Sequence, residues 1–248
     1  MPQASKIYFA SDFHLGSPDY QTSRIREDLI VQWLDMIKAD ASELFLVGDI
    51  FDFWFEYNKA IPKGFIRFQG KLAELADSGI KITFFKGNHD MWMFDYFTQE
   101  MGVEIISNEL IIERFGKKIY LHHGDGLGPG DGSFKILKTI FRGKFSQWLF
   151  ARLHPNLGLW IGQSWSLHRR HNYPELEFYG IEHEWIALYC KEMLKKEHFD
   201  YMIFGHRHMT LDIPFGNSRY VNLGEWFKTK SYAVLDATGL KLEYFRKA

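Results

Sequence analysis

The sequence has a single cysteine, Cys190, among 248 residues. One cysteine excludes an intramolecular disulfide, and such sparse use of cysteine is typical of a reducing cytoplasm. Long hydrophobic runs are also absent, since the N-terminal run Ile7–Ala10 is too short for a signal-peptide core and no stretch has the length of a spanning helix. We therefore expect a cytoplasmic protein without membrane-spanning segments.

Excess charge of either sign is lacking too. Lys and Arg number 30 against 31 Asp and Glu, which gives a net charge of −1 at pH 7. The molecule as a whole therefore has no field that attracts nucleic acid or a membrane, and such attraction needs a local patch. Hydrophobic residues make up 46%, as in ordinary globular proteins. The length fits one domain over residues 1–248, with or without an insertion.

Short apolar runs alternate with helical patterns in the first half of the chain. Runs of four to six apolar residues that end in a polar or glycine-containing cluster indicate buried strands. Helical patterns occupy Arg24–Lys38 and Phe65–Asp77. This alternation predicts a mainly parallel core sheet. Five runs have a polar cluster at their end: Lys6–Ala10, Glu43–Val47, Lys81–Phe85, Lys117–Leu121 and Tyr201–Phe204.

The second half adds shorter β signals. Leu110–Arg114 and the run from Lys117 predict a hairpin through Phe115-Gly116. Three later runs predict antiparallel strands that close a second sheet: Leu211–Phe215, Tyr220–Leu223 and Tyr232–Leu235. In open α/β sheets, ligands bind at the carboxyl ends of the strands. The polar clusters that follow the five runs are therefore expected to meet in one place.

These clusters carry the side chains of a metal site. Asp12 and His14 are two residues apart, so they leave the same face of an extended segment, and His206 and His208 repeat this spacing. Nitrogen and oxygen donors without thiolate suit Mn, Fe or Zn, and a pair of such ions can orient a phosphate and stabilise an in-line displacement. The remaining candidate ligands are Asp49, which could bridge two ions, Asn88 and His123.

Each cluster alone also has an ordinary structural interpretation. An Asp-x-His is usually a turn or a helix cap, and Gly48-Asp49 alone is typical of a turn. Adjacent residues of a strand point to opposite faces, so only one of His122 and His123 should reach the site. We choose His123, which precedes Gly124-Asp125. Five clusters in order after five strands favour the metal site.

The series Asp12-x-His14, Gly48-Asp49, Gly87-Asn88-His89-Asp90, His123-Gly124-Asp125 and Gly205-His206-x-His208 resembles the calcineurin-like metallophosphoesterase family. The resemblance implies a four-layer α/β/β/α sandwich and two divalent ions, with manganese expected. It implies that His89 contacts the phosphate and assists the leaving oxygen, that Asp90 orients His89, and that Asp125 and Arg207 bond to ligands. The implied ligands of one ion are Asp12, His14, Asp49 and His208, and those of the other are Asp49, Asn88, His123 and His206.

The segment from Phe134 to His171 contains seven basic residues and no Asp or Glu, although the average for the chain would place nearly five acids there. Aromatic and aliphatic residues are interspersed with the bases, Trp148, Trp160 and Trp165 among them. One interpretation is an amphipathic helical pair that packs on the core. The absence of acids favours contact with an anionic membrane surface, or a lid over a ligand with a charged head and apolar tails.

The chain also resembles one branch of that family, the UDP-2,3-diacylglucosamine hydrolases (diphosphatases) of lipid A biosynthesis. The resemblance rests on four parts of the sequence: Gly48–Trp54, His123-Gly124-Asp125 followed by Asp131 and Phe134, the helical insertion, and Val221–Trp226. It implies that the diphosphate of a lipid-linked UDP-sugar is cleaved and that residues 131–172 form a lid for the acyl chains. With the basic, aromatic segment above, we expect the enzyme to contact the inner face of the cytoplasmic membrane. The implied substrate contacts are Asn88, His89, Asp131, Phe134, Arg169 and Arg170.

Other functions remain open at this point. His89 could protonate an alkoxide, which a phosphate leaving group hardly requires, so another phosphodiester, phosphomonoester or nucleotide is the alternative substrate. Nucleic acid is not expected, because it requires a long basic track with stacking aromatic residues. A non-catalytic metal-binding scaffold is the alternative from another class of protein. Every candidate ligand position is filled in this sequence, which argues against that scaffold.

Overall fold

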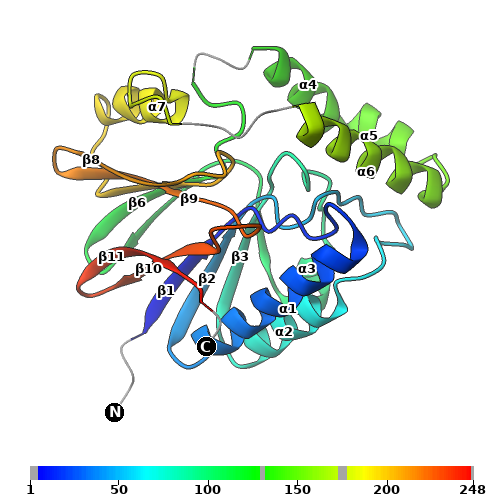
Figure 1. The fold of residues 1–248 in the computed structure, drawn as a ribbon, viewed down its shortest axis with the longest axis horizontal. Helices are drawn as coiled ribbons and strands as arrows, with labels where there is room; N and C mark the ends of the chain where they lie inside the picture. The colour runs from blue at the N-terminus through cyan, green and yellow to red at the C-terminus, as the bar shows by residue number, and fades with distance from the viewer. Residues whose placement is uncertain (1–4, 129–131, 173–177, 247–248) are drawn as a thin grey trace.

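The computed structural model describes residues 5–128, 132–172 and 178–246, with two β-sheets and helices on their outer faces (Figure 1). The first sheet has the order β11-β10-β1-β2-β3-β4 and the second the order β5-β6-β7-β9-β8. The strands of the first sheet are β1 Lys6–Ala10, β2 Ala41–Val47, β3 Lys81–Phe85, β4 Glu104–Ile106, β10 Ser231–Asp236 and β11 Gly239–Tyr244. Those of the second are β5 Leu110–Arg114, β6 Lys117–His122, β7 Tyr201–Phe204, β8 Thr210–Phe215 and β9 Ser218–Leu223.

The first sheet is parallel in its centre and antiparallel at one side. β1, β2, β3 and β4 pair in parallel, so the loops after β1, β2 and β3 leave the same edge. β10 pairs antiparallel with β1, and Tyr8 lies opposite Val234. The prediction that the strand over Tyr232–Leu235 closes the second sheet is therefore wrong. Pairing with β1 depends on a contact more than two hundred residues away, which a local pattern cannot indicate.

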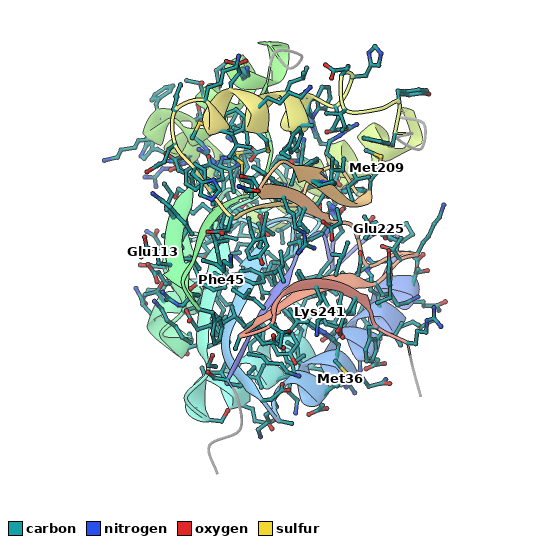
Figure 2. The ribbon with its side chains drawn as sticks, turned by 90° about the vertical axis from the view of Figure 1, so that its left-hand side faces the viewer. Met36, Phe45, Glu113, Met209, Glu225 and Lys241 are labelled. Atoms are coloured by element: carbon teal, nitrogen blue, oxygen red, sulfur yellow. The ribbon has the colours of Figure 1, made fainter. Side chains whose placement is uncertain are left out.

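The second sheet combines a hairpin with a parallel centre. β5 and β6 form the predicted hairpin, and β6, β7 and β9 pair in parallel. β8 returns antiparallel to β9. The loop that contains Glu225, labelled in Figure 2, then leads the chain from β9 to β10 in the first sheet. Both sheets thus present the carboxyl ends of parallel strands to the site.

Apolar side chains from both sheets fill the space between them. Phe45, labelled in Figure 2, stacks on Phe9 with ring centroids 5.2 Å apart, and both belong to the cluster that joins the sheets. α1 Tyr20–Ile37, α2 Ile66–Asp77 and α3 Tyr96–Met101 bury their apolar sides against the outer face of the first sheet. α7 Trp185–Leu194 covers the outer face of the second sheet (Figure 1). This arrangement confirms the predicted four-layer α/β/β/α class.

Three further helices stand beside the two sheets at the end where the site loops emerge (Figure 1). They are α4 Gly132–Arg142, α5 Lys144–Phe150 and α6 Pro155–Asn172. Trp92 Nε1 donates to the carbonyl of Phe141, and Arg142 donates to Ser107 O and Asn108 Oδ1. These bonds attach α4 to the body of the protein. In the described ranges, no helix combines the length and the apolar character that crossing a bilayer requires.

Candidate metal centre

The loops after β1, β2 and β7 bring the first group of predicted ligands together. His14 Nε2 lies 3.0 Å from His208 Nε2 and 3.7 Å from Asp49 Oδ2. His208 Nε2 lies 3.2 Å from Asp12 Oδ1. One donor atom from each of Asp12, His14, Asp49 and His208 fits within 4.8 Å of the others. Side chains far apart in the sequence therefore point at a single position.

A second group meets the first at Asp49. His123 Nε2 lies 3.3 Å from Asp49 Oδ2 and 3.4 Å from Asn88 Oδ1. His206 joins Asp49 and His123, again with donor atoms within 4.8 Å. Asp49 thus belongs to both groups, which is the arrangement expected of a bridging carboxylate.

The donor atoms are oriented as a divalent ion requires. His123 Nδ1–H donates to the carbonyl of Val47 at 2.8 Å, which directs Nε2 toward Asp49. Such a bond from the far nitrogen fixes the tautomer of a metal-binding histidine. Imidazole and carboxylate donors without thiolate match Mn, Fe or Zn. The residues at this position therefore fit a pair of divalent cations.

The backbone at the site is strained. Asp12, His14 and Asp49 have φ of 56°, 44° and 54°, and His206 and His208 have 69° and 51°. Residues other than glycine rarely adopt positive φ, and the cost is of the order of 1 kcal/mol or more each. Strain of this kind persists where the surrounding structure imposes it and is concentrated at functional sites. Five of the seven predicted ligands share it.

Glycines allow the strand ends to come this close. Gly48 has φ of 84°, and a Cβ there would overlap the ring of His123. A Cβ on Gly87 would overlap the carboxylate of Asp49. A side chain at Gly48 would push apart loops of the two sheets, and a side chain at Gly87 would push apart the loops after β2 and β3 of the first sheet.

Burial and mutual charge set the protonation of the group. Burial opposes ionisation of Asp49, but His123 and then His89 hold its pKa well below the usual value. Burial also opposes protonation of His123, yet the Asp49 carboxylate raises the pKa of His123 to about 10. Burial and the charge of His123 lower the pKa of His206 to about 3. Asp49 is therefore ionised and His206 neutral at pH 7, which are the ligating forms, whereas His123 is protonated beside Asp49 and would lose its Nε2 proton on binding an ion.

His89 stands beside the first group of ligands. Its ring meets that of His14 edge to face, with centroids 4.7 Å apart. Its Nδ1–H donates to the carbonyl of Asp52 at 2.9 Å, and Ser166 Oγ of α6 lies 3.2 Å from the same nitrogen. Nε2, at the other side of the ring, remains for a ligand.

Asp90 has a different role from the one expected. It was expected to orient His89, but its carboxylate accepts the backbone N–H groups of Gly87 and Ile50, both at 2.8 Å. Burial and the charge of Asp49 raise the pKa of Asp90 to about 6. Asp90 thus fixes the loops that carry Asn88 and Asp49, and Asp52 holds His89.

The expected roles of Asp125 and Arg207 also change. Lys138 Nζ of α4 lies 2.6 Å from Asp125 Oδ2. Arg207 binds Glu184 with both ends of its guanidinium, at 2.9 to 3.1 Å. Both residues therefore attach the ligand loops to neighbouring segments, Asp125 to α4 and Arg207 to the N-cap of α7.

The structure separates the two adjacent histidines as alternation predicts. His123 faces Asp49, whereas His122 Nδ1 accepts the N–H of Gly124 at 2.8 Å. Burial lowers the pKa of His122 to about 4, which keeps it a neutral acceptor. His122 therefore shapes the turn that carries His123.

Sequence reasoning missed Asp52 and Ser166. Asp52 follows Asp49 by three residues, and this spacing within one loop was an available signal, whereas Ser166 had none. The predicted substrate contact Asp131 lies outside the described residues, as do the side chains of Phe134, Arg169 and Arg170.

An apolar cavity of about 260 Å³ opens beside these groups. At its polar end lie Asp52, Asn88 and His89. The other walls are apolar and come from the loops after β2 and β3 and from α4, α5 and α6: Phe53, Met91, Trp92, Leu137, Phe141, Phe150, Ile161 and Trp165. A ligand held there could place a phosphate against His89 and an apolar portion among the aromatic rings.

Comparison with protein families gives a match to calcineurin-like phosphoesterase over residues 5–210. The chain belongs to this family. The side chains described above that could hold metal ions thus belong to a calcineurin-like phosphoesterase, and the family implies divalent metal ions.

Curated relatives of this calcineurin-like phosphoesterase extend over the whole chain. The UDP-2,3-diacylglucosamine hydrolase of Porphyromonas gingivalis is 37% identical over 96% of this chain and 97% of its own length. The hydrolase of the same name from Histophilus somni is 25% identical over 95% of this chain and 98% of its own. Among solved structures, an archaeal phosphodiesterase aligns over 97% of this chain and 99% of that chain, with TM-score 0.49 and 11% identity.

Proposed function

We propose that this protein hydrolyses the diphosphate of UDP-2,3-diacylglucosamine, giving UMP and 2,3-diacylglucosamine 1-phosphate for lipid A biosynthesis. The observation that carries the proposal is the apolar cavity that begins at Asn88 and His89. A water-soluble phosphoester without acyl chains has little apolar surface to bury in such a cavity. Acyl chains would bury theirs, and each buried methylene stabilises binding by roughly 0.8 kcal/mol. The relatives named for this activity match the chain from end to end.

The proposal includes two divalent ions, with manganese as the expected metal. A pair of such ions activates water and offsets the charge that develops on the phosphate. One ion would be held by Asp12, His14, Asp49 and His208, and the other by Asp49, Asn88, His123 and His206. The short distances within these two groups, and their shared carboxylate, support this assignment.

His89 would bind the phosphate that leaves. Because Asp52 O accepts from Nδ1, the ring is held with Nε2 directed away from the loop. In its protonated form, a histidine held in this way donates from Nε2 to a phosphate oxygen as negative charge develops there. Asp90 would act indirectly, through the N–H groups of Gly87 and Ile50 that it holds.

Residues 131–172 would form a lid over the acyl chains. α4, α5 and α6 provide more than half of the apolar wall of the cavity, and Ser166 of α6 reaches His89. Asp131, Phe134, Arg169 and Arg170 remain the predicted contacts to the sugar, the acyl chains and the phosphates.

The outer side of the same helices would contact the inner face of the cytoplasmic membrane. Phe145, Trp148 and Trp160 are 73%, 53% and 64% exposed, and Arg152 lies over the ring of Trp148 at 5.0 Å. Exposed aromatic rings among basic residues fit an interface with anionic lipid. Sedimentation with vesicles that contain anionic lipid tests this contact, and the double variant F145S/W160S should stay in the supernatant.

The substrate is tested by comparing the diacylated UDP-sugar with its deacylated form. We expect kcat/KM for the diacylated compound to be higher by at least about a hundredfold, since two buried acyl chains supply several kcal/mol. Equal turnover of both compounds would contradict the proposed substrate. Preference for an alkyl phosphodiester would instead favour a phosphodiesterase in which His89 protonates the leaving oxygen.

A further inference from the structure

Two glycines lie one turn apart in α6, Gly158 and Gly162, and both are buried. Two of the three residues between them are exposed, Trp160 by 64% and Ile161 by 37%. A glycine inside a helix costs about 1 kcal/mol relative to alanine. Close packing that leaves no room for a Cβ would explain why two glycines lie on the buried side of one helix.

That reason is contact with the loop that follows Asp49. A Cβ on Gly162 would overlap three atoms of the Phe53 ring, and a Cβ on Gly158 would overlap the hydroxyl of Tyr57. The Tyr57 hydroxyl is at the end of a side chain that can turn aside. The Phe53 ring packs against Trp92 and Phe150, with centroids 6.0 and 6.1 Å away, so moving it aside would disturb both contacts. Gly162 therefore determines how closely α6 approaches the body of the protein.

This contact lies at the wall of the apolar cavity. Phe53 and Gly162 both line the cavity that begins at His89. Phe53 follows Asp52, whose carbonyl holds His89, and Ser166 lies one turn beyond Gly162 and 3.2 Å from His89 Nδ1. The depth at which α6 packs thus affects both the apolar wall and the position of Ser166.

We propose that Gly162 is a specificity-determining residue: by allowing α6 to pack directly on Phe53, it sets the dimensions of the apolar cavity and hence the acyl-chain length that the enzyme prefers. The inference about chain length rests on the proposed function. The packing of α6 itself can be measured without any substrate.

The test is G162A, with G70A as the matched control. Gly70 is an exposed glycine inside α2 whose added Cβ would meet no atom within 4 Å. In G162A, α6 must lift from Phe53, and overpacking of this kind corresponds to roughly a tenfold change in an equilibrium. We expect amide exchange of α6 to accelerate about tenfold, and the kcat/KM ratio between the preferred diacyl substrate and a longer-chain homologue to fall toward one. G70A should change neither.

A double-mutant cycle with F53A tests the contact directly. Removal of the Phe53 ring makes room for the methyl group added at position 162, so amide exchange of α6 should be slower in F53A/G162A than in G162A alone. The inference is overturned if G162A and G70A show the same amide exchange rate in α6 and the same kcat/KM ratio between the two chain lengths. It is also overturned if adding F53A to G162A does not slow the amide exchange of α6. Failure of the proposed function looks different: the wild-type enzyme would then hydrolyse acylated and deacylated compounds equally.

Discussion

Asp49 combines three features at one residue: it belongs to both ligand groups, its backbone is left-handed, and its pKa is lowered by neighbouring histidines. Asn is one of the few residues that tolerate positive φ. D49N therefore keeps the strained backbone and removes the charge. D49N thus tests metal ligation without a change in backbone strain, whereas D49A would change both.

D49N should bind fewer than two ions and lose hydrolysis by at least about a thousandfold, because several kcal/mol of charge stabilisation depend on both ions. Elemental analysis of the Mn²⁺-dialysed protein and initial rates on an aryl phosphodiester measure the two effects. Circular dichroism is the control for folding. Retention of activity would rule out Asp49 as the shared ligand.

At the scale of elements, a buried ion pair joins α4 to the loop after β6. Asp125 is 1% exposed and its partner is Lys138. Removing one member of a buried pair costs about 3–5 kcal/mol, because the other charge stays buried. K138M should therefore lower the free energy of unfolding by about 3 kcal/mol in urea titration. K135M is the control, since Lys135 is exposed on the same helix and bonds to a carbonyl; an equal effect of both would contradict this role of Lys138.

Helices α1 and α2 are connected by exposed ion pairs whose contribution depends on pH. Lys38 and then Lys71 lower the pKa of Glu74 from 4.5 to about 2. A carboxylate with a lowered folded pKa stabilises the protein above its unfolded pKa, and this contribution is lost as pH falls through the folded value. E74Q should thus be less stable than wild type at pH 7, and the difference in Tm should shrink between pH 4.5 and 2. E100Q, at an exposed position of α3, is the control variant.

The sequence predicted elements where local pattern decides them. Lys6–Ala10, Lys81–Phe85 and Tyr201–Phe204 have their predicted bounds, because each is a continuous apolar run with a sharp polar end. α3 and β4, of six and three residues, are too short for a period to appear. The site residues could be grouped from strand ends alone. Which residue holds His89 could not be predicted, since the bond is to the backbone carbonyl of Asp52 and depends on how two loops pack.

At the scale of the whole molecule, the site joins the two sheets. Asp12, His14, Asp49 and Asn88 follow strands of the first sheet, and His123, His206 and His208 follow strands of the second. Ions bound between them would bind only the folded state and stabilise it by mass action. EDTA should therefore lower Tm by several degrees and Mn²⁺ should restore it. D49N should respond less, and an equal Mn²⁺ shift in D49N would contradict binding between the sheets.

The single thiol reports on the integrity of the second sheet and its covering helix. Cys190 of α7 is fully buried, and burial raises its pKa above the usual value. Thiols react as thiolates, so alkylation by iodoacetamide should be slow in the native protein and fast in urea. Rapid labelling without denaturant would show that α7 separates from the sheet.

The order of strands in the first sheet also bears on biosynthesis. β1 leaves the ribosome long before β10, with which it pairs, and the candidate ligands extend from Asp12 to His208. A nascent chain therefore cannot complete the candidate metal site before His208 is translated, nor the sheet before β10 is translated. Pairings between such distant segments fold slowly. Chains released early would expose an unpaired β1 edge and only part of the ligand set, which makes them natural clients for chaperones and proteases.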